Sequence, residues 1–169
     1  MTRVEEMIAV AVSPQQAMRL LVTAASFSGW VSPDITVTPL TAAPRLSPGD
    51  RFRLSLLGGL TFEYLLEAET DREVVFAFTG PWSGEERWSF IADGSDTVIR
   101  RRYEVRSAGA LALLAWETVG RALVLAHFKL ELSRFRALVQ REPGIRAEID
   151  HRQSSPEAAE TRRYPIDEG

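Results

Sequence analysis

The feature that most constrains the fold of this chain is a series of short strand-like segments followed by one long apolar helix. Segments that alternate apolar and polar residues fill most of 49–106, and brief turn signals separate them. From about 108 to 140, apolar residues recur at helical spacing instead. Connections this short pair neighbouring strands as antiparallel hairpins. The sequence therefore predicts an α+β domain in which a curved antiparallel β-sheet wraps around a long C-terminal helix.

The N-terminal region predicts one strand and two short helices before the main sheet. Residues 4–12 are rich in Val, Ile and Ala, as an opening strand requires. Ser13 followed three residues later by Gln16 is a capping-box pattern, so a helix begins there. A second short helix is expected at 27–30. The strand expected at 35–40 contains Pro39, which predicts a position at the edge of the sheet.

Composition bounds the kind of protein. With 169 residues and 45% hydrophobic content, the chain is long enough for one substantial core, which we assign to residues 1–141. Residues 142–169 are polar, and we expect them to form a disordered tail. A net charge of -3 gives no overall attraction to nucleic acid, and strand alternation splits the basic run 100–102 between two faces of the sheet. Nucleic-acid binding is therefore not expected.

Several other classes of site lack the residues they need. Cysteine is absent, and the two histidines, His127 and His151, form no metal-ligand or catalytic-triad pattern, so we expect no metal and no cofactor. The N-terminus is acidic where a signal peptide is apolar, and no stretch of about 18 uncharged apolar residues follows. The expectation is a cytoplasmic protein without stable membrane insertion, either a monomer or a homodimer.

Side-chain alternation along the strands predicts an aromatic inner face. Successive strand residues point to opposite sides, so Arg101 is expected to point inward beside Tyr103, unless a one-residue bulge reverses the count. Trp82 stands in an expected loop, where it either gates a cavity or plugs one end of the sheet. The residues expected to line a ligand cavity are Phe62, Tyr64, Phe76, Phe78, Trp82, Trp88 and Phe90 from the sheet, with Val124 and Phe128 from the helix.

Helical spacing at about 100° per residue places Glu117 and Arg121 on the same face as Val124 and Phe128. Charges on an apolar face suggest a lined cavity instead of a solid core. Under this interpretation Glu117 is a general acid or base. Arg101 or Arg121 holds a developing enolate oxygen, and Tyr64 or Tyr103 donates a hydrogen bond. The alternative is that Glu117 and Arg121 form an i,i+4 ion pair that only stabilises the helix.

The order of elements resembles the helix-grip (SRPBCC) superfamily, which includes START domains, Bet v 1-like proteins and polyketide cyclases and dehydrases. The resemblance covers about 4–139 and rests on Ser13-Pro14-Gln15-Gln16, Phe27-Ser28-Gly29-Trp30, Leu46-Ser47-Pro48-Gly49-Asp50-Arg51-Phe52 and Glu86-Arg87-Trp88-Ser89-Phe90. It implies a cavity under the helix that binds a lipid, steroid or polyketide. The superfamily has no universal catalytic motif, so the resemblance identifies no reaction.

Three functions remain open from the sequence. The leading hypothesis is a cofactor-independent, polyketide cyclase-like or dehydratase-like enzyme that uses general acid/base chemistry on a hydrophobic, polyketide-like molecule. The main alternative is a noncatalytic carrier or sequestering protein for a lipid-like or polyketide ligand. The third is a protein-interaction module whose cavity is filled by its own side chains.

Overall fold

The computed structural model describes residues 2–56 and 58–141. The predicted tail therefore lies outside the described residues. The strands are β1 (Thr2–Val10), β2 (Ile35–Pro39), β3 (Arg51–Leu56), β4 (Thr61–Glu69), β5 (Glu73–Thr79), β6 (Trp82–Asp93) and β7 (Asp96–Ala108). The helices are α1 (Pro14–Val22), a 3₁₀ turn (Ala24–Ser26), α2 (Phe27–Trp30), α3 (Ala110–Ala115), a π turn (Trp116–Gly120) and α4 (Arg121–Arg141).

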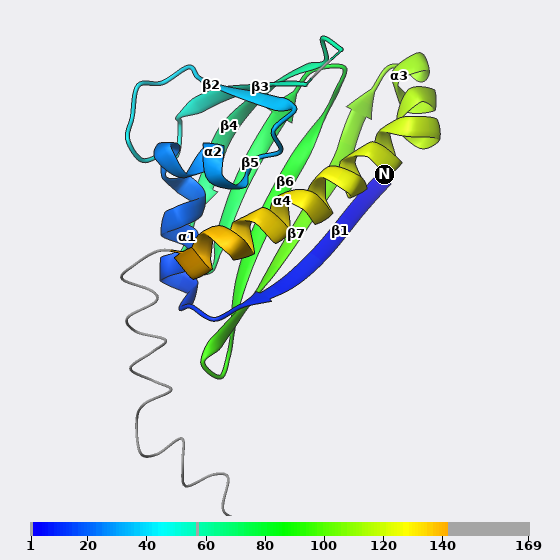
Figure 1. The fold of residues 1–169 in the computed structure, drawn as a ribbon. Helices are drawn as coiled ribbons and strands as arrows, with labels where there is room; N and C mark the ends of the chain where they lie inside the picture. Colours follow the sequence, from blue (N-terminus) through cyan, green and yellow to red (C-terminus); the bar gives the residue numbers. More distant parts are fainter. Residues whose placement is uncertain (1, 57, 142–169) are drawn as a thin grey trace, which may run out of the picture.

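The described strands form one antiparallel sheet in the order β1-β7-β6-β5-β4-β3-β2. Consecutive strands from β2 to β7 are neighbours, as short hairpin connections require. The sheet curves, and α4 crosses its concave side, with α1 and α2 at one end and α3 at the other (Figure 1). This arrangement confirms the predicted helix-grip fold, including the two short helices after the first strand and the edge position of Pro39 in β2.

The start of α1 follows the predicted capping box. The Ser13 hydroxyl accepts the backbone N–H of Gln16 at 3.3 Å, and the Gln16 side chain accepts the backbone N–H of Ser13 at 3.0 Å. No such side-chain cap forms at α2, where the Ser26 side chain makes no capping hydrogen bond. The capped helix directs Leu21 and Val22 into the core, where both are fully buried.

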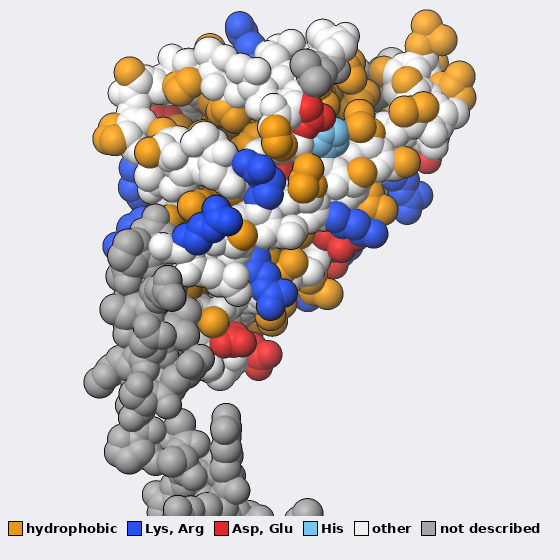
Figure 2. All heavy atoms as spheres, in the orientation of Figure 1, with side chains coloured by type: hydrophobic (Ala, Val, Ile, Leu, Met, Phe, Trp, Pro, Cys, Tyr) orange, Lys and Arg blue, Asp and Glu red, His pale blue; other side chains and the backbone are white. Residues whose placement is uncertain are grey.

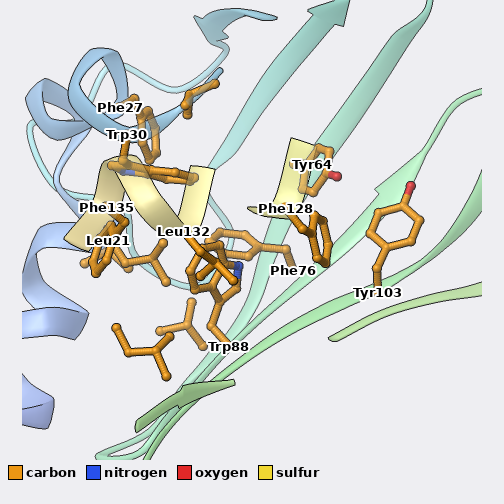
Figure 3. Close-up of a cluster of buried hydrophobic side chains, with 14 of the residues drawn as sticks. Leu21, Phe27, Trp30, Tyr64, Phe76, Trp88, Tyr103, Phe128, Leu132 and Phe135 are labelled. Carbon is orange, nitrogen blue, oxygen red and sulfur yellow. The ribbon is translucent and has the colours of Figure 1, made fainter. Parts of the chain in front are cut away.

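Aromatic rings form much of the core (Figure 3). Phe78 and Tyr103 stack with their ring centroids 4.3 Å apart, and Trp30 packs edge-to-face on Trp88 and Phe135. Such pairs add stability beyond the area they bury. The inner face predicted from strand alternation is confirmed, because these residues are all buried: Phe62, Tyr64, Phe76, Phe78, Trp88, Phe90, Arg101 and Tyr103.

The expected loop around Trp82 is wrong, because Trp82 begins β6 and pairs with Ala108 of β7. The sheet register shifts between Ser83 and Gly84, where β7 carries one additional residue. Gly84 is required here, since an added Cβ would lie 1.9 Å from the carbonyl oxygen of Glu104. The bulge lies beyond Tyr103 along β7, so it does not reverse the predicted orientation of Arg101.

The π turn changes which residues of the long helix face inward. A π turn contains one more residue than an α turn, so the helical phase shifts by one position across it. Trp116 and Gly120 consequently occupy the buried face, while Glu117 and Arg121 are exposed. The prediction that these two charges lie on the apolar face is therefore wrong. It followed from counting backward from Phe128 at a constant α-helical repeat.

Length and apolar composition would allow one helix of the described region, Ala110–Arg141, to cross a membrane. In the structure its second half packs as a core helix does. Phe128, Leu132, Phe135 and Val139 are buried, and α4 contacts β1 and α2. Its first half is different, because Leu111, Leu114 and Val119 are largely exposed.

Candidate functional site

A small cavity lies between α4 and the concave side of the sheet. Its volume is about 60 Å³, and its walls are mostly aliphatic and aromatic. The lining residues are Ile35, Leu54, Leu56, Leu60, Phe62, Tyr64, Trp82, Arg101, Tyr103, Leu123, Val124, His127, Phe128 and Glu131. Figure 2 shows hydrophobic side chains gathered at the hollow between the helix and the strands above it, with a histidine and an acidic side chain beside them.

A second space of about 20 Å³ adjoins the first toward α2. The two share Leu54, Tyr64, Arg101 and Glu131 as lining residues, and the smaller one adds Trp30, Phe76, Glu86 and Trp88, among others. Spaces of this size hold a few water molecules at most. The interior is thus largely filled by side chains, with a polar group at the junction of the two spaces.

That polar group is a buried ion network centred on Arg101 of β7. Its Nε donates to Glu86 Oε1 at 2.8 Å, and its Nη1 donates to Glu131 Oε2 at 2.5 Å. All three side chains are at most 6% exposed. Burying one charge is costly, whereas a hydrogen-bonded set of opposite charges is tolerated. Glu86 comes from β6 and Glu131 from α4, so the network connects the helix to the sheet.

Neighbouring groups complete the hydrogen bonding of both carboxylates. Glu86 also accepts the indole N–H of Trp88 at 2.7 Å and the hydroxyl of Tyr64 at 3.1 Å. Glu131 also accepts the backbone N–H of Ser32 at 3.1 Å. Every carboxylate oxygen in the network therefore has a donor, which holds the two side chains in fixed positions.

The guanidinium of Arg101 lies between two aromatic rings. Its central carbon is 3.7 Å from the centroid of the Phe128 ring and 4.5 Å from that of Trp88. A cation that lies above the face of an aromatic ring is attracted to the ring. Burial alone would lower the pKa of Arg101, but the Glu86 and Glu131 carboxylates outweigh it and raise the pKa above its usual value. Arg101 is a permanent positive charge at this site.

Two tyrosine hydroxyls face the same region. Figure 3 shows Tyr64 and Tyr103 beside Phe128, and both tyrosines line the larger cavity. The Tyr103 hydroxyl accepts the indole N–H of Trp82 at 2.9 Å. Burial raises the pKa of both tyrosines, and the Glu86 charge raises them further. Both hydroxyls therefore stay protonated at neutral pH and serve as hydrogen-bond donors.

His127 forms a second polar group at the rim. Its Nε2 lies 2.9 Å from Asp34 Oδ2, and its Nδ1 lies 2.9 Å from the carbonyl oxygen of Leu123. Both neighbours are acceptors, so the ring satisfies both contacts only when both nitrogens carry protons. The contact with Asp34 joins α4 to the segment between α2 and β2. The ring also lines the larger cavity.

The residues predicted to form the site divide into four groups. Arg101 and Tyr103, predicted to be catalytic, line the larger cavity together with the predicted ligand-binding residues Phe62, Tyr64, Trp82, Val124 and Phe128. Phe76 and Trp88 line the smaller space, and Phe78 and Phe90 are buried without lining either one. Glu117 and Arg121 line neither. Glu117 instead accepts a hydrogen bond from Thr2 at the exposed surface.

Glu86 and Glu131 were missed, although the sequence carries a signal for each. Strand alternation from Trp88 and Phe90 places Glu86 on the same inner face. Helical spacing from Phe128 and Phe135 places Glu131 on the buried stripe, three residues from one and four from the other. Glu131 follows the π turn and Glu86 belongs to a strand, so the shift in helical phase affects neither signal.

Comparisons with known proteins agree with this architecture. The sequence model of the family described as "Polyketide cyclase / dehydrase and lipid transport" matches residues 1–140. Among curated proteins, none matches this sequence.

Solved structures with similar folds include protein CV1439 from Chromobacterium violaceum. Its TM-score is 0.65 at 9% identity, over 84% of this chain and 100% of that one. DynU16, from the dynemicin biosynthetic locus, has a TM-score of 0.59 at 12% identity, over 82% of this chain and 47% of that one. The Aha1 dimer from Colwellia psychrerythraea has a TM-score of 0.50 at 17% identity, over 78% of this chain and 97% of that one.

Identities this low show a shared fold and nothing about ligands or reactions. The family match is of another kind, because it covers most of the chain and spans every described helix and strand except the last residue of α4. It confirms the resemblance found in the sequence. The chain belongs to the polyketide cyclase/dehydrase and lipid transport family.

Proposed function

We propose that this chain binds a hydrophobic, polyketide-like small molecule in the cavity between α4 and the sheet. The observation that supports the proposal is an apolar cavity with a few fixed polar groups on its wall, namely Arg101, Tyr64, Tyr103 and Glu131. Small-molecule sites are built in this way, with apolar walls for affinity and a few polar groups for orientation. The family to which the chain belongs includes proteins of lipid transport.

The cavity must enlarge to admit such a ligand. Its 60 Å³ is well below the roughly 300–1,000 Å³ of typical ligand sites. The aliphatic residues Leu54, Leu123 and Val124 are only half-buried, whereas the aromatic residues beneath them are buried. Rotation of these rim side chains would open the cavity toward solvent while the aromatic floor and the Arg101 network stay in place.

Filling the cavity tests this proposal. Val124→Trp places a large side chain at the cavity wall, while Ala122→Trp adds the same side chain at an exposed position of the same helix. We expect naphthalene, titrated by calorimetry, to bind the original chain and the Ala122→Trp variant. Binding to Val124→Trp should be lost while its circular dichroism stays unchanged. Equal binding by both variants would place the ligand elsewhere.

A second candidate function is cyclisation or dehydration at the same site. It is favoured by one arrangement, in which a carboxylate, a guanidinium and two protonated tyrosine hydroxyls face a single apolar cavity. In this proposal Glu131 takes a proton from the carbon beside a substrate carbonyl and, for dehydration, returns it to the β-hydroxyl as the C–O bond breaks, so that water leaves. Tyr103 and Arg101 hold the resulting enolate oxygen. Glu131 replaces Glu117 in this role because only Glu131 reaches the cavity.

Turnover distinguishes the enzyme from the carrier. A β-hydroxyketone substrate would lose one water molecule to give the conjugated ketone, which is measured by its ultraviolet absorbance. An enzyme should lose about 100-fold or more of its rate on Glu131→Gln while still binding the substrate. A carrier should release the β-hydroxyketone unchanged.

A further inference from the structure

The charged groups at the larger cavity, taken together with the partners they pair with, hold an excess of negative charge. Among the described residues that line it, Arg101 and His127 are the cationic side chains, and each is already paired. Arg101 is paired with both Glu86 and Glu131, and His127 with Asp34. Glu131 is the carboxylate among the lining residues, and Glu86 and Asp34 lie behind them as partners of the two cations. With every group ionised, these paired groups together hold three carboxylates and two cations. No positive charge at the cavity is left to pair with an acidic ligand.

Hydrogen-bond donors nevertheless remain at the cavity. The Nε and Nη1 groups of Arg101 are bonded to carboxylates, but among the described residues no hydrogen bond uses its Nη2 group. The Tyr103 hydroxyl accepts from Trp82, interacts with the neighbouring Tyr64 hydroxyl and carries its own proton, which a ligand oxygen can accept. A donor that already accepts a hydrogen bond is strengthened by it. These donors suit an oxygen acceptor that brings no charge of its own.

We propose that the cavity selects neutral ligands bearing a carbonyl or hydroxyl oxygen and rejects carboxylates. The inference rests on the proposed ligand binding and narrows its chemistry. A neutral carbonyl oxygen gains hydrogen bonds from Tyr103 and Arg101 at a small cost in hydration. A carboxylate would lose its hydration in an apolar cavity and would also meet the excess negative charge of the Glu86–Arg101–Glu131 network.

Ligands matched in shape test this selectivity. 2-Acetylnaphthalene and 2-naphthoate differ only by a methyl group in place of a charged oxygen, and both can be titrated by calorimetry at neutral pH. We expect the ketone to bind at least about tenfold more tightly. Any apolar cavity disfavours a charged ligand, so 2-naphthylmethylammonium is the third ligand. The excess negative charge predicts that this cation binds more tightly than 2-naphthoate.

Changing the protein tests the cause. Glu131→Gln removes one negative charge and keeps an oxygen for Arg101. It should therefore reduce the difference in affinity between 2-acetylnaphthalene and 2-naphthoate. Glu67→Gln removes an exposed carboxylate from β4 and should leave this difference in affinity unchanged. If Glu131→Gln does not fold, the order of the three ligands on the original chain still decides.

The possible outcomes separate the two proposals. The selectivity is supported if 2-acetylnaphthalene and 2-naphthylmethylammonium both bind more tightly than 2-naphthoate. A carboxylate that binds as tightly as the ketone or the ammonium ion overturns it and leaves ligand binding intact. If naphthalene and all three derivatives fail to bind, ligand binding in this cavity is overturned, and the selectivity with it.

Discussion

Arg101 and Glu131 are 30 positions apart in the sequence and form an ion pair in the interior, with 2.5 Å between Nη1 and Oε2. The first belongs to β7, the neighbour of the edge strand β1, and the second to the helix that crosses the sheet. Together with Glu86 they form the polar centre of an otherwise apolar interior. The pair thus fixes both the position of α4 and the charge that a bound molecule would meet.

Loss of the Arg101 charge should strongly destabilise the fold. Arg101→Met leaves Glu86 and Glu131 as buried carboxylates without a counter-ion, which should lower the free energy of unfolding by about 3–5 kcal/mol. Urea denaturation measures this loss. The control is Arg102→Met on the outer face, where a partly exposed pair with Glu5 is worth less than about 1 kcal/mol. Similar losses in the two variants would contradict the importance of the buried network.

Gly84 should not tolerate a side chain. In Gly84→Ala the new Cβ would collide with the backbone of Glu104, which cannot move without breaking the β6–β7 ladder. We expect a loss of about 3 kcal/mol or more in thermal or urea unfolding. Gly109→Ala is the matched control, because a Cβ there meets no atom within 4 Å and the change should cost less than about 1 kcal/mol. A stable Gly84→Ala protein would show that the bulge can relax.

The contact between His127 and Asp34 should make stability depend on pH. Burial lowers the pKa of His127, but hydrogen bonds to Asp34 and to the Leu123 carbonyl outweigh it and raise the pKa above 6.5. Hydrogen bonds from Ser32 and His127 lower the pKa of Asp34 below 3.8. The His127 contribution is fully present below pH 6.5 and is lost as the pH rises through the raised value. The Asp34 contribution is present above pH 3.8 and is lost in acid.

Free energies of unfolding, measured for variants over a range of pH, test this pH dependence. His127→Gln should differ most from the original chain near pH 5, and the difference should shrink as the pH rises toward about 8. It should stay below about 1 kcal/mol, because the Asp34 side chain is 41% exposed and solvent screens the pair. Lys129→Gln, on the exposed side of α4, should give a difference that does not vary over this range. A His127→Gln difference that is constant with pH would show that the ring stays neutral.

Glu117 and Arg121 should be dispensable for ligand binding. Both are exposed and neither lines the cavity, so Glu117→Gln and Arg121→Gln should leave naphthalene affinity unchanged. Loss of the hydrogen bond between Thr2 and Glu117 at the surface should cost less than about 1 kcal/mol. A strong loss of binding in either variant would show that these side chains lie at the ligand site after all.

Strand alternation predicted the inner face of the sheet because it counts residues within one strand. Arg101 and Tyr103 were placed correctly, since the bulge in β7 lies beyond both. Trp82 was misplaced because Gly and Pro around it are typical of a loop, whereas β7 continues far enough to pair with it. Pairing with a distant segment overrides local composition, and a turn pattern alone does not reveal it.

Helical counting predicted the second half of the long helix and failed in the first half. Phe128, Leu132 and Phe135 are buried as expected, but the prediction for Glu117 crossed the π turn. Nothing in the local composition of Trp116–Gly120 marks a change of helical repeat. The turn is accompanied by two contacts that only the folded chain provides, Trp116 on Trp82 and Trp116 on Tyr103.

The π turn also affects how this chain is aligned with its relatives. An extra residue in a helix is equivalent to an insertion of one position, which the sequence can accommodate without disturbing the contacts of α4. An alignment that carries no gap at Trp116–Gly120 will match Glu117 and Arg121 to residues that line the interior of a relative with a regular helix. Functional residues transferred from such a relative to Glu117 or Arg121 should therefore be moved by one residue toward the N-terminus, to Trp116 or Gly120.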